Sequence, residues 1–170
     1  MAQTNILLEA GTNELEVVEF YLDEILPNGV VPEGLQPAQE LANAYAAKEA
    51  EEKGGEPTVY RGYYGVNVAK VLEIIRMPKV TELPEVQHPC VLGAFNLRSR
   101  IIPLVDLAMW LGKTGVPSPD AKNIVTEFNN VTTAFMVSGV NRIHRISWEE
   151  VEPPNRYVAV VTQSTIVGVV

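Results

Sequence analysis

The sequence contains one cysteine, Cys90, and only two histidines, His88 and His144. A single thiol excludes an internal disulfide and leaves no cysteine cluster to hold a metal ion. His88 and Cys90 lie two residues apart, but two ligands are too few for a structural zinc site. We therefore interpret Cys90 as a small buried apolar residue, and we expect neither a metal nor a cofactor.

Long apolar runs are also missing. No segment approaches the roughly 20 consecutive apolar residues that span a bilayer, and the first residues lack the basic group and apolar core of a secretory signal. The composition, 46% hydrophobic and 20% charged over 170 residues, is typical of a globular chain that can bury a core. We expect a cytoplasmic protein that does not insert into membranes.

Positive charge is scarce. The chain has 13 lysines and arginines against 21 acidic residues, a formal net charge of -8. The basic residues are scattered except for Arg98 with Arg100 and Arg142 with Arg145. This distribution argues against a nucleic-acid partner.

Catalytic signatures are absent as well. There is no G-x-x-x-x-G-K-[ST], no G-x-G-x-x-G between a strand and a helix, and no serine in a nucleophile-elbow context. Glu149 and Glu150 are adjacent on a predicted helical turn and point apart, which makes them a poor acid-base pair. We expect no enzyme activity. The alternative, a small-molecule-binding β domain or an unrecognised enzyme, would use the polar cluster at residues 96–100.

What the sequence does contain is β-strand patterning. Alternation of apolar and polar residues predicts a strand at 15–23 and another beginning at 60. Two apolar segments, 123–128 and 132–137, flank an Asn-Asn turn and predict a hairpin. The segment 157–170 is strongly β in character and stops without a turn, so we expect that the natural protein continues beyond it.

Residues 93–112 predict a compact unit of strand, polar turn, strand and short helix. Asp106 fits the N-cap of that helix and Gly112 its end. Pro103 lacks a backbone N–H, so its strand should lie at a sheet edge or carry a bulge. Further on, Ser147 and Glu150 match a capping box at the start of a helical turn.

Residues 27–58 differ in kind. Turn-forming residues are followed by a segment of high helix propensity at 38–53. The pattern predicts a surface insertion between strands. A solvated helix in a long loop is favoured over a partner-binding arm.

The segment 71–75, V-L-E-I-I, is apolar on both faces of any strand. If Leu72 and Ile74 point to the core, Val71 and Ile75 flank Glu73 on the other face and need a cover. Either a second sheet of the same chain or a partner protein would supply it.

Three segments, in this order, resemble signature segments of the CheW-like domain. They are Y-G-V-N-V-A-K-V-L-E-I-I from Tyr64, P-C-V-L-G-A-F-N-L-R-S-R-I-I-P-L-V-D-L from Pro89, and T-A-F-M-V-S-G-V-N-R-I from Thr133. The start, residues 4–20, is similar to CheV, in which such a domain precedes a phosphorylatable receiver domain.

The resemblance implies an all-β fold with short helices, built as two intertwined five-stranded SH3-like barrels. It implies a scaffold that couples methyl-accepting chemoreceptors to the histidine kinase CheA. Residues 1–170 would form one coupling domain with an insertion at about 27–58 and no C-terminal receiver domain. The family's final hairpin is missing, which leaves the second barrel incomplete and allows exposed edges to pair in a homodimer.

The resemblance also implies site residues. The arginine of the family's N-L-R-G motif, which lies by the receptor groove, is Arg98, and the motif's glycine is replaced by Ser99. An acidic residue usual before a later glycine is replaced by Ser138. The expected receptor-binding residues are Asn96, Leu97, Arg98, Arg100 and Val140. The expected contacts with the regulatory domain of CheA are Val71, Leu72, Glu73 and Ile75.

Overall fold

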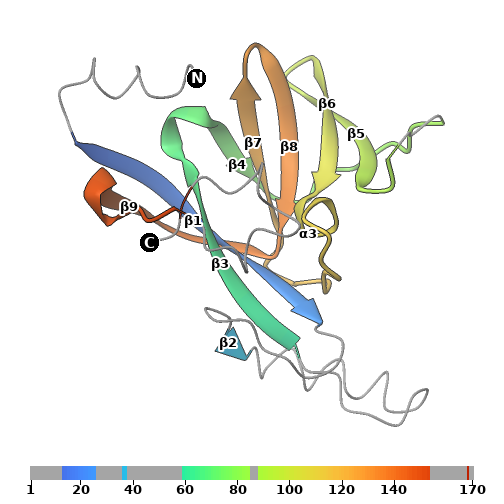
Figure 1. Cartoon of the computed structure of the whole chain (residues 1–170). Helices are drawn as coiled ribbons and strands as arrows, with labels where there is room; N and C mark the ends of the chain where they lie inside the picture. Colours follow the sequence, from blue (N-terminus) through green and yellow to red (C-terminus); the bar gives the residue numbers. More distant parts are fainter. Residues whose placement is uncertain (1–12, 26–35, 38–58, 85–87, 154–167, 169–170) are drawn as a thin grey trace, which may run out of the picture.

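Two β-sheets, linked by short helical turns, make up the computed structural model, which describes residues 13–25, 36–37, 59–84, 88–153 and 168 (Figure 1). The strands are β1 (Glu14–Ile25), β2 (Gln36–Pro37), β3 (Val59–Asn67), β4 (Val71–Ile75), β5 (Val91–Leu97), β6 (Arg100–Asp106), β7 (Lys122–Phe128), β8 (Val131–Val137) and β9 (Gly139–Ser147). A short helix, α3 (Leu107–Trp110), follows β6, and two 3-10 turns are η2 (Val68–Lys70) and η3 (Trp148–Glu150). Among these residues no helix is long and apolar enough to cross a bilayer.

The first sheet is antiparallel, with the strand order β2-β3-β1-β9. We call it sheet A. The chain enters it from β8 at Ser138, whose hydroxyl accepts a hydrogen bond of 2.8 Å from the backbone N–H of Asp23. A Cβ on the next residue, Gly139, would overlap the ring and hydroxyl of Tyr21, so a larger residue at this crossing would displace that buried side chain.

The second sheet, which we call sheet B, has the order β4-β7-β8-β6-β5. Only its β6–β8 pair is parallel. Its two edge strands, β4 and β5, place Ile75 and Leu97 against the same buried cluster, which is formed by Phe95, Ile102, Leu104, Val125 and Ala134. Because residues from both edges share one core, the sheet is curled into a barrel rather than flat.

A second buried cluster joins the two sheets. Phe20 and Leu22 of sheet A pack with Ile124 and Val137 of sheet B and with two residues near α3, Ala108 and Leu111. Each large apolar side chain buried here contributes about 1.5–3 kcal/mol. The two sheets therefore share a core.

Buried charges also connect the end of β1 to its surroundings. Asp23 is completely buried and accepts two hydrogen bonds from Arg61, at 2.7 and 3.1 Å. This contact raises the pKa of Arg61. Glu24 pairs at 2.8 Å with Lys113, in the loop after α3. Backbone bonds between the same loop and β1 complete the link.

The predicted strands, hairpin and helical turns are confirmed. Asp106 caps α3 by accepting from the Met109 N–H, and the capping box of Ser147 and Glu150 is present. The predicted helix at 38–53 and, apart from Gly168, the predicted strand at 157–170 lie outside the described residues.

The expectation that the strand of Pro103 lies at a sheet edge or carries a bulge is wrong, because β6 lies between β5 and β8 and its register shows no extra residue of its own. Ala94, opposite Pro103, uses its own N–H and carbonyl to bond Thr81. Position 103 is therefore a non-hydrogen-bonded site toward β5, and pairing with β8 begins only at Leu104. No ladder bond is lost at the proline, and the bulge lies in β5, between Val91 and Gly93.

Candidate functional site

The turn between β5 and β6 carries the predicted receptor anchor. Arg98 and Ser99 both have positive φ, 50° and 68°, as in a type I′ hairpin turn. The Asn96 side chain accepts a 3.0 Å hydrogen bond from the Ser99 N–H, which holds the turn. Glycine is the residue best suited to the second position. Ser99 therefore preserves the turn at a cost in stability.

Arg98 does not stand alone on this turn. Its side chain is 79% exposed, and it donates a hydrogen bond of 3.2 Å to the carboxylate of Glu73 on β4. Arg100 lies 3.9 Å from Glu127. The structure thus joins a residue predicted to bind a receptor, Arg98, to a residue predicted to bind a kinase, Glu73.

The residues of β4 that point away from the core are Leu72 and Ile74. Leu72 and Ile74 are 53% and 40% exposed. Val71 packs against the cluster between the sheets, whereas Ile75 packs inside sheet B. The cause is an irregularity in the β4–β7 register between Val71 and Glu73, which turns the strand. The chain itself partly covers Val71 and Ile75, and the uncovered apolar residues are Leu72 and Ile74.

A groove of about 440 Å³ lies between the two sheets. Sheet A contributes residues of β1 and β3, and sheet B and α3 contribute the rest. It is lined by Phe20, Gly65, Val66, Val105, Leu107, Trp110, Ile124, Thr126, Phe128, Thr133 and Phe135. None of these side chains is charged, so the groove suits an apolar surface of a partner.

An exposed apolar strip continues from this groove toward the Arg98 turn. Phe128, which lines the groove, is 46% exposed, and Val131, directly opposite it across the β7–β8 hairpin, is 63% exposed. Ile101 is 79% exposed and lies four residues before the groove residue Val105, on the same face of β6. We call Phe128, Val131 and Ile101 the apolar strip.

The predicted receptor residues divide between two places. Asn96, Arg98 and Arg100 are exposed together on the β5–β6 hairpin, and Leu97 next to them packs inside sheet B. Val140 lies in β9 of the other sheet and packs against the cluster between the sheets. The structure therefore brings the first four residues together but not Val140, and the groove is lined by none of them.

The family follows from the sequence match. The model of the CheW-like domain matches residues 58–170. The chain belongs to the CheW-like domain family. It is 50% identical over 102 residues to chemotaxis protein CheV3 of Helicobacter pylori. The aligned region covers 58% of this chain and 32% of CheV3. Chemotaxis protein CheW of the same organism is 29% identical over 91 residues, covering 53% of this chain and 54% of that protein.

A solved member of the family has the same fold. The scaffolding protein TtCheW from Thermoanaerobacter tengcongensis superposes with a TM-score of 0.61 at 21% identity, over 91% of this chain and 80% of that one. The predicted CheW-like fold, all-β with short helices in two intertwined units, is confirmed. The described residues supply five strands to one unit and four to the other.

The matches cover only part of the length of these relatives. The chain spans about a third of the CheV3 protein and about half of the CheW protein. The similarity to CheV that the sequence indicated is confirmed. That residues 1–170 form one coupling domain with an insertion at 27–58 stays a prediction.

The sequence did not lead us to the apolar strip or to Trp110 beside it, which is 52% exposed. Ile101 and Ile102 are adjacent in a predicted strand, where successive side chains point to opposite faces, so only one of the two could point into the core. This alternation could have indicated that Ile101 is exposed.

His88, one of the two residues considered as metal ligands, lies beside Trp110. The ring centroids of His88 and Trp110 lie 5.5 Å apart. Within the described ranges, no three His, Cys, Asp or Glu side chains are grouped as metal ligands.

Proposed function

We propose that this CheW-like protein is a chemotaxis scaffold that couples methyl-accepting chemoreceptors to the histidine kinase CheA. The observation that carries the proposal is the uncharged groove between the sheets, continued by the apolar strip. Surfaces of this kind take the apolar face of a helix. Membership of a family that includes chemotaxis proteins supports the same role.

The receptor partner is a helical hairpin tip lying along the groove and the apolar strip. Its apolar residues pack on Phe128, Val131 and Ile101. Arg98, exposed at the adjoining turn, is the polar anchor. An acidic or amide group on the receptor would take the hydrogen bond that Arg98 now gives to Glu73.

The receptor contact is tested by calorimetry with a soluble receptor tip. We expect Ile101→Glu and Arg98→Glu each to weaken binding at least tenfold while the circular dichroism spectrum stays unchanged. The matched control is Ile143→Glu, because Ile143 is 60% exposed on β9 and not on the strip. Equal affinities for all variants would move the receptor contact elsewhere.

The kinase partner contacts β4 through its exposed residues. Leu72, 53% exposed, replaces Val71 as the main apolar contact in this proposal, and the side chain of Glu73 beside it is 26% exposed. We expect Leu72→Asp to weaken binding to the CheA regulatory domain without unfolding the protein. Val71→Asp would place a charge at a half-buried position and should lower the stability of the fold, so its effect on kinase binding would not isolate a direct contact. Wild-type affinity for the kinase domain in the Leu72 variant would refute this contact.

The remaining parts of the proposal are a non-enzymatic role and a cytoplasmic location. The alternative of a small-molecule or catalytic site at residues 96–100 has no specific observation in its favour, because Asn96, Arg98 and Arg100 are exposed and line no part of the groove. A homodimer through exposed edges stays a prediction, and light scattering would measure it.

A further inference from the structure

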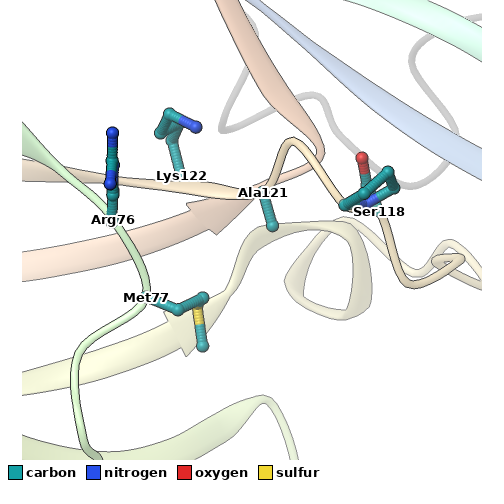
Figure 2. A pocket seen from close by; sticks show the side chains of 6 residues that line it. Arg76, Met77, Ser118, Ala121 and Lys122 are labelled. Carbon is teal, nitrogen blue, oxygen red and sulfur yellow. The ribbon is translucent and has the colours of Figure 1, made fainter.

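An open cleft of about 470 Å³ lies where β4 ends and β7 begins, apart from the groove (Figure 2). It is lined by Arg76, Met77, Ser118, Pro119, Ala121 and Lys122. Two of these side chains are cationic and none is acidic. The lining is therefore positive, although the chain as a whole has a formal charge of -8.

The two cations face each other across the strands. Ile75 pairs with Asn123, so continuing the antiparallel register by one residue places Arg76 opposite Lys122. In Figure 2 both side chains extend to the same side, whereas Ala121 points away. Like charges directly opposite each other destabilise a sheet. The arrangement therefore costs stability in the free protein.

No counter-ion offsets this cost among the described residues. Neither Arg76 nor Lys122 forms an ion pair there, and Lys122 donates only to the backbone carbonyl of Asp120, at 3.3 Å. Arg61 and Lys113, by contrast, each have a carboxylate within 3 Å. The cation pair is thus left open toward solvent.

The backbone beneath the cleft is held firmly. Asn123, which is completely buried, donates from its amide to the carbonyl of Arg76 at 3.3 Å and to the sulfur of Met77 at 3.2 Å. These bonds fix the end of β4 against the start of β7. The backbone at Arg76 and Lys122 is therefore held in place before binding, and only the flexible ends of the two side chains become ordered when a ligand binds.

The cleft is continuous with the exposed part of β4. Ile74, 40% exposed, lies two residues before Arg76 and so on the same face of the strand, and Met77 in the cleft is 48% exposed. Leu72 lies farther back on the same strand. A partner covering this strand would meet apolar residues first and then two positive charges.

We propose that Arg76 and Lys122 form a docking site for an acidic segment of the protein partner that covers β4. The proposal rests on the kinase contact of the proposed function and adds the chemistry that the partner must bring, namely carboxylates placed next to an apolar contact. The guanidinium of Arg76 and the ammonium of Lys122 then each bind a carboxylate oxygen. The like-charge repulsion between them is relieved in the complex.

The first test uses hexaglutamate as the probe and the full chain labelled with nitrogen-15. We expect saturable shifts confined to the side-chain N–H of Arg76 and the amides of 118–122, and weaker ones at higher salt. The double variant Arg76→Gln with Lys122→Gln should lose them. Lys79→Gln, which removes a charge from an exposed lysine near the cleft, should keep them. No saturable shift, or the same shift in the double variant, overturns the docking site.

The second test measures affinity for the CheA regulatory domain in the same variants. The double variant should bind about tenfold more weakly than wild type, and Lys79→Gln should bind within twofold of it. If Leu72→Asp abolishes binding but the double variant binds as wild type does, the docking site is wrong and the kinase contact stands. If wild type does not bind this domain, the kinase contact fails, and localised hexaglutamate shifts still support a site for acidic segments.

Discussion

Replacing Ser99 by glycine should stabilise the protein. Ser99 has φ 68° at the second position of the hairpin turn, where a side chain costs about 1–2 kcal/mol. Glycine avoids that cost but loses more freedom on folding, by about 0.5–1 kcal/mol. The hydrogen bond from position 99 to Asn96 uses the backbone N–H and survives the change. The net gain is about 0.5–1 kcal/mol.

The assay is thermal unfolding followed by circular dichroism. For a chain of this size we expect the midpoint of Ser99→Gly to rise by about 2–3 °C. The matched control is Asn130→Gly, because Asn130 occupies the corresponding position of the β7–β8 turn with φ 64°. Asparagine tolerates this conformation better than serine does, so the control should gain less.

Two outcomes would refute this reasoning. One is an unchanged or lower midpoint for Ser99→Gly, which would mean that the serine side chain stabilises the turn. The other is an equal gain at Asn130, which would mean that the effect is general to such turns. Affinity for the receptor tip should stay the same in Ser99→Gly, because Arg98 is kept.

Two further predictions concern the buried charges. Arg61→Met should lower the free energy of unfolding, measured in urea, by about 3 kcal/mol, because it leaves the buried Asp23 without its partner. The control is Arg145→Met, which removes an exposed ion pair and should change the free energy of unfolding little. Equal effects of the two substitutions would contradict the prediction. Burial lowers the pKa of Lys113, but the contacts with Glu24 and Tyr64 together outweigh burial and raise the pKa from its usual 10.5. The charged Lys113 therefore stabilises the fold fully below pH 10.5, and this contribution is lost as the pH rises through the higher pKa that Lys113 has in the folded protein. In that pH range the free energy of unfolding should fall more steeply for the wild type than for Lys113→Met.

The sequence predicted most strands because alternation and turn residues are local signals. The Asn-Asn turn is an example, since both residues adopt positive φ as the hairpin requires. The capping box at Ser147 is another. Such elements depend on neighbours within a few positions.

The sequence could not predict the outcome for β4. Its residues are apolar on both faces, and only the shifted register against β7 decides that Leu72 and Ile74 are exposed. The burial of Asp23 was equally hidden, because its partner Arg61 lies 38 residues away. The apolar strip requires β6, β7 and β8 to lie side by side, although α3 and β7 separate β6 from β8 along the chain.

The order of strands along the chain bears on how the protein is made. Sheet B is built from one continuous stretch, residues 71–137, which is inserted between β3 and β9 of sheet A. A nascent chain can therefore close sheet B while β1, which pairs with β3 on one side, still lacks its other partner, β9. One edge of β1 stays unpaired until residues 139–147 leave the ribosome, and during that interval this edge can pair with another molecule.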